Sequence, residues 1–226
     1  MTEGFLEIWH GDILPPKPEK LDYYQFLNAD EKEKASTFVR PELQKKYIKT
    51  RGVLRKVLGS YLNEKPQEII INTGEYGKPF INESRLYFNL SHAGNKFVIA
   101  VSNCGEVGVD IEQYKNRNNL SGLVRKCFSD VEKAYWQCLS EEQKVAMFYR
   151  LWVRKEAFVK AVGRGIALGL NQCVVNPQNH TRFLNIPDEY GLSNDWKIVD
   201  VKLNKDDACA VVIKDMKFNF KQIELE

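Results

Sequence analysis

Residues 106–112, with the sequence EVGVDIE, place two carboxylates inside a short apolar run. The composition of this run predicts a β-strand. Asp110 and Glu112 are two positions apart, so in a strand both side chains leave the same face. Two negative charges held so close together repel, and each raises the pKa of the other. A metal ion bound between them would make this arrangement tolerable.

The rest of the chain predicts an α+β fold, because each half holds helices flanked by antiparallel strands. The predicted strands are rich in apolar and β-branched residues and cover 5–13, 68–73, 86–92, 97–102, 106–112, 196–203 and 208–214. The predicted helices have apolar residues at helical spacing and cover 29–39, 42–62, 129–140 and 141–162. A polar loop is expected over 116–122. The comparable order of elements predicts two similar lobes, residues 1–104 and 105–226.

The composition fits a soluble protein with a core, since 43% of the 226 residues are apolar and 28% are charged. No stretch approaches the roughly 18–20 uninterrupted apolar residues of a membrane span. The first residues show no basic region followed by an apolar run. The five cysteines are scattered, and none forms a C-x-x-C pair, which argues against zinc and against a disulfide framework. These features predict a cytoplasmic protein without a membrane partner.

Positive charge is concentrated in two segments, although the net charge is only +3. Residues 40–56 hold seven basic side chains against one acidic, and residues 115–126 hold four basic and none acidic. Such segments predict contact with an anionic partner.

Three further motifs carry groups that bind phosphate or metal. In the motif 151–165, Trp152, Glu156 and Lys160 share one face of the helix predicted over 141–162. The segment 89–94, NLSHAG, puts a serine and a histidine at the end of a strand, and 76–80, YGKPF, holds a lysine in a turn. Alone, these motifs also suit an amphipathic helix, a solvated turn and a reverse turn. Together with the carboxylates of 106–112 they supply what phosphoryl transfer from a diphosphate requires, namely metal ligands and positive charge.

The motifs resemble those of a known family, the 4′-phosphopantetheinyl transferases. GVDIE at 108–112, followed by WVRKEAFVKA at 152–161, is similar to the paired family signature G-[IV]-D-x-E and W-x-x-K-E-x-x-x-K. YGKP, FNLSH and FSDVE (128–132) resemble the accompanying motifs of the long, monomeric surfactin-type branch, in the expected order. The resemblance implies a pseudo-dimer of two lobes with coenzyme A and magnesium in the cleft between them.

The resemblance also implies roles for individual residues. The magnesium ligands would be Asp110, Glu112 and Glu156. Contacts to coenzyme A would come from residues of the shared motifs, namely Lys78, Pro79, Ser91, His92, Asp110, Lys155, Glu156 and Lys160. Lys46 and Arg51 are candidates for the adenosine 3′-phosphate, although the family often has arginine where this chain has Lys46. Catalysis would use Lys160, with either Glu132 or Glu156 taking the proton of the attacking serine.

The family moves the 4′-phosphopantetheine arm of coenzyme A onto a serine of an apo carrier protein and releases adenosine 3′,5′-bisphosphate. For an acidic carrier, we expect docking at the basic segment 115–126. The predicted carrier contacts are Arg117, Leu120, Leu123, Arg125 and Lys126, and a solvated loop is the ordinary alternative for this segment. The resemblance implies a monomer.

Two other functions are compatible with parts of the pattern. Clustered carboxylates and basic segments also suit a magnesium-dependent phosphodiesterase or nuclease, but such a site does not require the accompanying motifs in this order. A non-enzymatic nucleotide-binding or nucleic-acid-binding module is disfavoured by the small net charge and by the lack of an aromatic-rich basic sheet. The sequence therefore predicts a transferase without a nucleic-acid partner.

Overall fold

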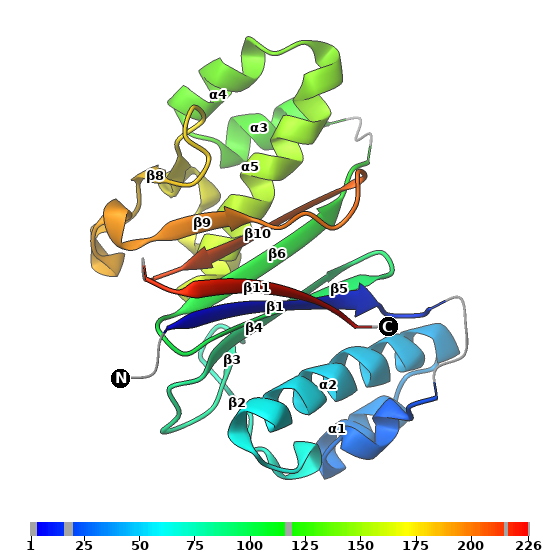
Figure 1. The fold of residues 1–226 in the computed structure, drawn as a ribbon. Helices are drawn as coiled ribbons and strands as arrows, with labels where there is room; N and C mark the ends of the chain where they lie inside the picture. The colour runs from blue at the N-terminus through cyan, green and yellow to red at the C-terminus, as the bar shows by residue number, and fades with distance from the viewer. Residues whose placement is uncertain (1–3, 16–19, 116–118, 215–216, 226) are drawn as a thin grey trace.

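The computed structural model describes residues 4–15, 20–115, 119–214 and 217–225. In this part of the chain, two antiparallel sheets each carry one long helix (Figure 1). The first sheet has the order β11-β1-β5-β4 and consists of β1 (Phe5–Asp12), β4 (Tyr87–Ala93), β5 (Lys96–Ser102) and β11 (Asn219–Leu225). The second has the order β6-β10-β9 and consists of β6 (Val107–Gln113), β9 (Lys197–Asp200) and β10 (Asp207–Ile213). All neighbouring strands are antiparallel except β1 and β11, which run parallel.

The elements stack in four layers, helix, sheet, sheet and helix, as Figure 1 shows. Helix α2 (Pro41–Leu62) covers the outer face of the first sheet through an apolar cluster that includes Val53, Leu54 and Leu58. Helix α5 (Glu141–Ala161) covers the second sheet in the same way. A third cluster fills the space between the sheets with side chains of β1, β5, β6 and β10. Strands β5, β6 and β10 are thus buried on both faces, which explains their continuous apolar runs.

Shorter elements connect these layers. They comprise α1 (Ala29–Ser36), α3 (Leu120–Cys127), α4 (Asp130–Gln137), β2 (Asn72–Thr73), β3 (Pro79–Phe80), β7 (Val174–Val175) and β8 (Phe183–Asn185), with 3-10 turns at Tyr23–Phe26, Pro66–Glu68, Gly165–Leu168, Leu170–Gln172, Asp188–Tyr190 and Ser193–Asp195. Helix α4 begins at a capping box in which Ser129 and Glu132 satisfy each other's backbone N–H groups. Helix α5 is followed by Gly163, whose φ of 72° is the left-handed conformation that ends a helix.

Three segments differ from the sequence-based prediction. Residues 120–122 were expected in a loop, but they begin α3, because Leu120, Leu123 and Val124 pack on the cluster under α5. The strand predicted over 68–73 is reduced to Asn72–Thr73, because the chain first makes a 3-10 turn and then buries Ile69. Strand β11 was not predicted, because its mostly exposed residues carry no clear alternation of burial.

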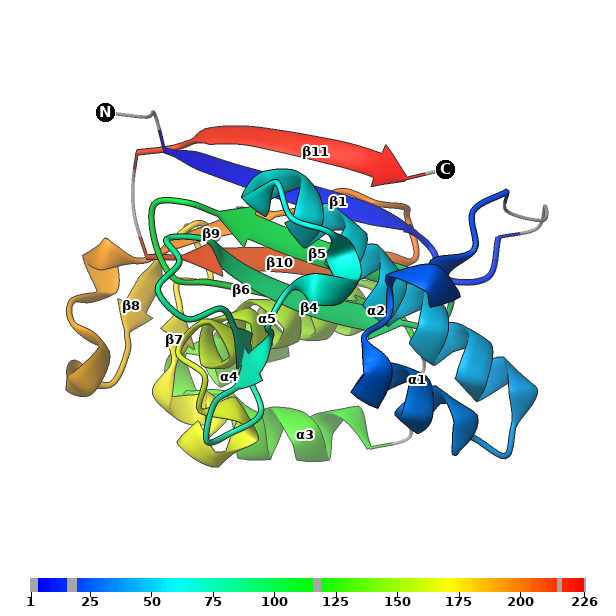
Figure 2. The same cartoon turned by 90° about the horizontal axis from the view of Figure 1, so that it is seen from below.

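The mixed α/β character is confirmed, and each half contributes one long helix and one antiparallel sheet core. The last strand departs from this division, because β11 pairs with β1 in the first sheet, and Figure 2 shows the two running side by side. The pseudo-dimer relation and the boundary between residues 104 and 105 stay predictions. No helix in the described part of the chain is both long and apolar enough to cross a membrane.

Candidate active site

Asp110, Ser91 and Lys160 meet where the two sheets and α5 come together. Asp110 Oδ1 accepts hydrogen bonds from Ser91 Oγ at 2.9 Å and from Lys160 Nζ at 2.6 Å. Lys160 Nζ also donates to Ser91 Oγ at 2.9 Å. The three side chains come from β6, β4 and α5, so the signature residues far apart in the sequence form one hydrogen-bonded cluster.

Two local features bring these elements together. The side chain of Asn89 on β4 accepts a hydrogen bond from the backbone N–H of Val109 on β6 at 2.9 Å, which holds the edges of the two sheets in register. Gly108 lets α5 lie directly on β6, because a Cβ atom there would lie 2.1 Å from the Ala157 carbonyl oxygen. Asn89 was not predicted as a site residue, although it lies inside the quoted motif FNLSH.

The electrostatics of the cluster favour a cation. Burial raises the pKa of Asp110, and the ammonium of Lys160 opposes that rise. The pKa of Glu156 is raised to about 7, first by burial and then by the negative charge of Asp110, with a smaller contribution from Glu112. Asp110 and Glu112 thus both act on the third predicted metal ligand, Glu156, while the mutual effect of Asp110 and Glu112 stays a prediction.

The donor set fits a hard divalent cation. Carboxylate oxygens are the ligands that magnesium prefers, usually together with water and substrate phosphates. Among the residues that the structure describes, no three histidine, cysteine, aspartate or glutamate side chains are already arranged around one cation position. Instead, Lys160 pairs with Asp110, so a bound cation would share or replace that contact. The oxygen chemistry therefore suits magnesium, and the complete ligand geometry is not preformed.

One cavity adjoins the cluster, and a second is lined by His92, the residue that follows Ser91. The first, of about 340 Å³, lies beside Glu156 and Lys160 and is walled by the YGKP turn and by residues Asn89, Leu90, Gly163 and Gly165. The second, of about 450 Å³, lies beside His92 and Lys46. The pKa of His92 is lowered, first by partial desolvation and then by the positive charges of Lys160 and Lys46. The first cavity is thus lined by residues of both halves of the chain, whereas the second is lined only by residues of the first half.

Some predicted phosphate contacts are engaged within the protein. Lys78 Nζ donates to the carbonyl oxygen of Ala161, which fastens the YGKP turn, including Pro79, to the end of α5. Burial lowers the pKa of Lys78. Arg51 donates to Glu31 through Nε at 2.8 Å and lies 2.6 Å from it through Nη2. Lys46 Nζ donates to the carbonyl oxygen of Gly94 at 3.2 Å.

Glu132 and Lys155 lie elsewhere, which argues against two predicted roles. Both side chains are completely buried and form an ion pair of 2.7 Å. Glu132 therefore has no access to the hydroxyl of an attacking serine, and Lys155 has none to a coenzyme A phosphate. The spacing of the motif WVRKE does not reveal that Lys155 is buried, because adjacent residues of a helix, such as Lys155 and Glu156, point in different directions.

The predicted carrier contacts divide into two groups. Arg125 and Lys126 are exposed at the end of α3. Leu120 and Leu123 are partly buried and pack on the cluster under α5. Arg117 lies outside the described residues.

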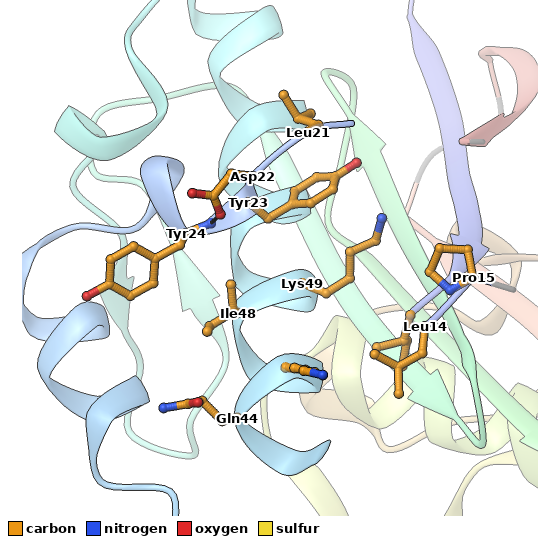
Figure 3. Close-up of a pocket in the computed structure, with 11 residues that line it drawn as sticks. Leu14, Pro15, Leu21, Asp22, Tyr23, Tyr24, Gln44, Ile48 and Lys49 are labelled. Carbon is orange, nitrogen blue, oxygen red and sulfur yellow. Dashed lines mark hydrogen bonds between the residues drawn. The ribbon is translucent and has the colours of Figure 1, made fainter. Parts of the chain in front are cut away.

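A further cavity of about 630 Å³ lies beside α2 and is shown in Figure 3. In Figure 3 the side chain of Lys49 extends toward the Tyr23 ring, with Nζ 4.0 Å from the centre of that ring. Among the described residues that line it, none is a predicted site residue, and Ile13 is shared with the cavity of His92 and Lys46.

The Asp110 carboxylate bonded to the Lys160 ammonium, with Glu156 lining the adjoining cavity, is typical of an enzyme that transfers a phosphoryl-containing group with a metal ion. Comparison with known proteins defines the family. Residues 106–212 match the family described as 4′-phosphopantetheinyl transferase superfamily, and residues 14–104 match the one described as 4′-phosphopantetheinyl transferase, N-terminal. The chain therefore belongs to the 4′-phosphopantetheinyl transferase superfamily, which confirms the resemblance and the enzyme class.

Individual relatives agree with this assignment. The chain is 29% identical to the 4′-phosphopantetheinyl transferase HetI of Nostoc over 96% of its own length and 90% of HetI. It is 32% identical to slr0495 of Synechocystis over 78% of its own length and 72% of that protein. It is 27% identical to the 4′-phosphopantetheinyl transferase Sfp of Bacillus subtilis over 74% of its own length and 75% of Sfp. Family membership favours the transferase over the phosphodiesterase and binding-module alternatives.

Proposed function

We propose that this chain transfers the 4′-phosphopantetheine arm of coenzyme A to a serine of an apo carrier protein in a magnesium-dependent reaction. The observation that carries the proposal is the cluster of Asp110, Ser91 and Lys160 beside Glu156, at the junction of the two sheets. We also propose that the chain acts as a cytoplasmic monomer whose two lobes, 1–104 and 105–226, enclose the site.

The chemistry exchanges one phosphorus–oxygen bond for another. The serine oxygen bonds to the phosphorus that carries pantetheine, the bond from that phosphorus to the adenosine 5′-phosphate breaks, and the serine proton passes to a base. Magnesium held by Asp110, Glu112 and Glu156 would neutralise charge on the diphosphate. Lys160 adds a positive charge next to Asp110, held there by Ser91. Of the two predicted bases, only Glu156 lines a cavity, so we assign the proton transfer to its carboxylate.

The two cavities, one beside Lys160 and one beside His92, suggest how coenzyme A lies. The cavity beside His92 and Lys46 would take the 3′-phosphate end, because two basic side chains border it. The cavity walled by Lys78 and Pro79 would take a neighbouring part of the molecule, next to Glu156 and Lys160. The diphosphate would then lie next to Asp110, Lys160 and Glu156, where the transferred group must be activated. Arg51 could bind the 3′-phosphate only if its hydrogen bond to Glu31 were broken.

The first test is the intact mass of several purified apo carrier proteins after incubation with this protein, coenzyme A and magnesium. We expect a mass gain of one phosphopantetheine on at least one carrier, together with release of adenosine 3′,5′-bisphosphate. The reaction should stop when magnesium is chelated and resume when it is restored. Release of the nucleotide without any carrier would instead indicate a phosphodiesterase and would contradict the proposal.

We expect carrier capture to depend on the exposed positive charges at the end of α3. Changing Arg125 and Lys126 together to glutamate should raise the KM for an acidic carrier about tenfold at low salt, because the long-range attraction is lost. The KM for coenzyme A should stay within twofold, and the difference between variant and parent should shrink as salt is added. The measurement is initial rate against carrier concentration at two ionic strengths.

The matched control reverses two exposed lysines outside both basic segments, Lys65 after α2 and Lys221 on β11, which changes the net charge by the same amount. If this control raises the carrier KM as much as the α3 variant does, only net charge matters and the docking proposal is wrong.

A further inference from the structure

The ion pair of Glu132 and Lys155 connects four parts of the second half of the chain. Glu132 Oε2 accepts from the backbone N–H of Ser129 at 2.8 Å and from its hydroxyl at 2.9 Å, and Oε1 accepts from the N–H of Val175 at 2.9 Å. Lys155 Nζ donates to the carbonyl oxygens of Leu170, at 2.9 Å, and of Cys173. The start of α4, the middle of α5, the turn at 170–172 and strand β7 are therefore joined through two side chains.

Both partners are buried to 0% exposure, so the pair lies in a region of low dielectric constant. There, separation of the two charges is costly and the satisfied hydrogen bonds favour a single arrangement. A carboxylate with both oxygens engaged in this way is not within reach of a substrate hydroxyl, which a general base requires. The pair therefore stabilises one geometry of the surrounding backbone.

That backbone carries the candidate active site. Lys155 directly precedes Glu156 on α5, and Lys160 follows little more than one turn later. After α5, the chain passes Gly163 and Gly165, which wall the cavity beside Glu156, before it reaches the carbonyl groups that Lys155 holds. Fixing Lys155 thus fixes both the rotation of α5 about its axis and the path of the segment that closes this cavity.

We propose that Glu132 and Lys155 are positioning residues for the transfer reaction. The pair holds α5 in the rotation that presents Glu156 and Lys160 to Asp110, and it holds the segment 163–175 against the cavity. This inference rests on the proposed function for its kinetic consequences, and it assigns Glu132 a role different from proton transfer. Because the motif FSDVE and the motif WVRKE supply one charge each, the two motifs act together within the protein.

The test compares Glu132→Gln, Lys155→Met and the double variant. Each new side chain is close in size and shape to the one it replaces, but it carries no charge. Each single variant leaves one buried charge unpaired, whereas the double variant removes both. We expect each single change to lower Tm, to lower kcat of the folded protein about 10²-fold and to raise the half-saturating magnesium concentration about tenfold, with the carrier KM changed less than threefold. In the double variant, kcat should recover to within about tenfold of the parent.

The surface ion pair of Asp130 and Lys133 on α4 provides the matched control. Lys133 Nζ lies 3.2 Å from Asp130 Oδ1, and the Asp130 side chain is 99% exposed. Asp130→Asn, Lys133→Met and their combination should leave Tm, kcat and the magnesium dependence unchanged. The same measurements on these variants show whether losing any ion pair on α4 is enough to lower Tm and kcat and to weaken magnesium binding.

Two outcomes would overturn the positioning role. If Glu132 is the base, the double variant stays as inactive as Glu132→Gln, whatever its Tm. If the pair only stabilises the fold, the single variants lower Tm but leave kcat and half-saturating magnesium of the folded protein unchanged. Calorimetric titration of magnesium into each variant with coenzyme A present gives a readout without a carrier. Failure of the parent protein to modify any carrier would contradict the proposed function, whereas equal magnesium affinity in all variants would contradict the positioning role.

Discussion

Changing Asp110 to alanine is expected to lower the rate of carrier modification about 10³-fold while the protein stays folded. The change removes the oxygen that both Ser91 and Lys160 contact, together with a proposed magnesium ligand. Metal-ion stabilisation of developing charge is worth several kcal/mol, and each ~1.4 kcal/mol corresponds to a tenfold rate change. Stability should fall little, because burial already disfavours the charged form of this carboxylate, as its raised pKa shows.

The rate is measured from the mass of the carrier over time at saturating coenzyme A and magnesium. Asp130→Ala removes a carboxylate of the same kind from an exposed position and should keep the parent rate. Because phosphoryl transfer depends mainly on positioning and electrostatics, Asp110→Ala should also lose more activity per folded molecule than Glu132→Gln. A larger loss in Glu132→Gln would contradict the assignment of the metal site.

Changing Gly108 to alanine is expected to lower both stability and activity, although the residue has no chemistry of its own. The added Cβ would lie 2.1 Å from the carbonyl oxygen of Ala157 and 2.3 Å from the N atom of Ala161, both backbone atoms of α5. Helix α5 must then move away from β6, which separates Glu156 and Lys160 from Asp110. Overpacking of this kind costs about 1–3 kcal/mol, and a displacement of about 1 Å at a reacting group costs on the order of 10²-fold in rate.

The unfolding transition and the rate of carrier modification are measured on the same preparation. Gly74→Ala is the matched control, because the nearest atom to its added Cβ would be the Lys78 carbonyl oxygen at an ordinary 3.5 Å. Parent-like Tm and activity in Gly108→Ala would show that the position of α5 on β6 does not depend on this close approach. The proposed role of Gly108 would then be wrong.

The elements that position the site were predicted where the apolar pattern is strong. The paired carboxylates of β6, the serine of β4 and the glutamate and lysine of α5 were all named from motif residues, and Asp110, Ser91 and Lys160 form direct contacts. Helix α3 and strand β11 were missed for different reasons. The first half-turn of α3 contains Ser121 and Gly122, which resemble a loop, and β11 is stabilised by pairing with a strand more than two hundred positions earlier.

The sequence by itself determined the family, the two long helices, the main strands and the identities of the charged groups. These depend on local spacing, which survives in a linear chain as periodicity and motif order. Only the tertiary structure decided which charges face a cavity and which pair inside the protein. Glu132 and Lys155 have the same residue types as Glu156 and Lys160, but packing of α4 and α5 encloses the first two and leaves the second two beside a cavity. Burial and partner choice arise from segments that meet in space, so no local pattern can contain them.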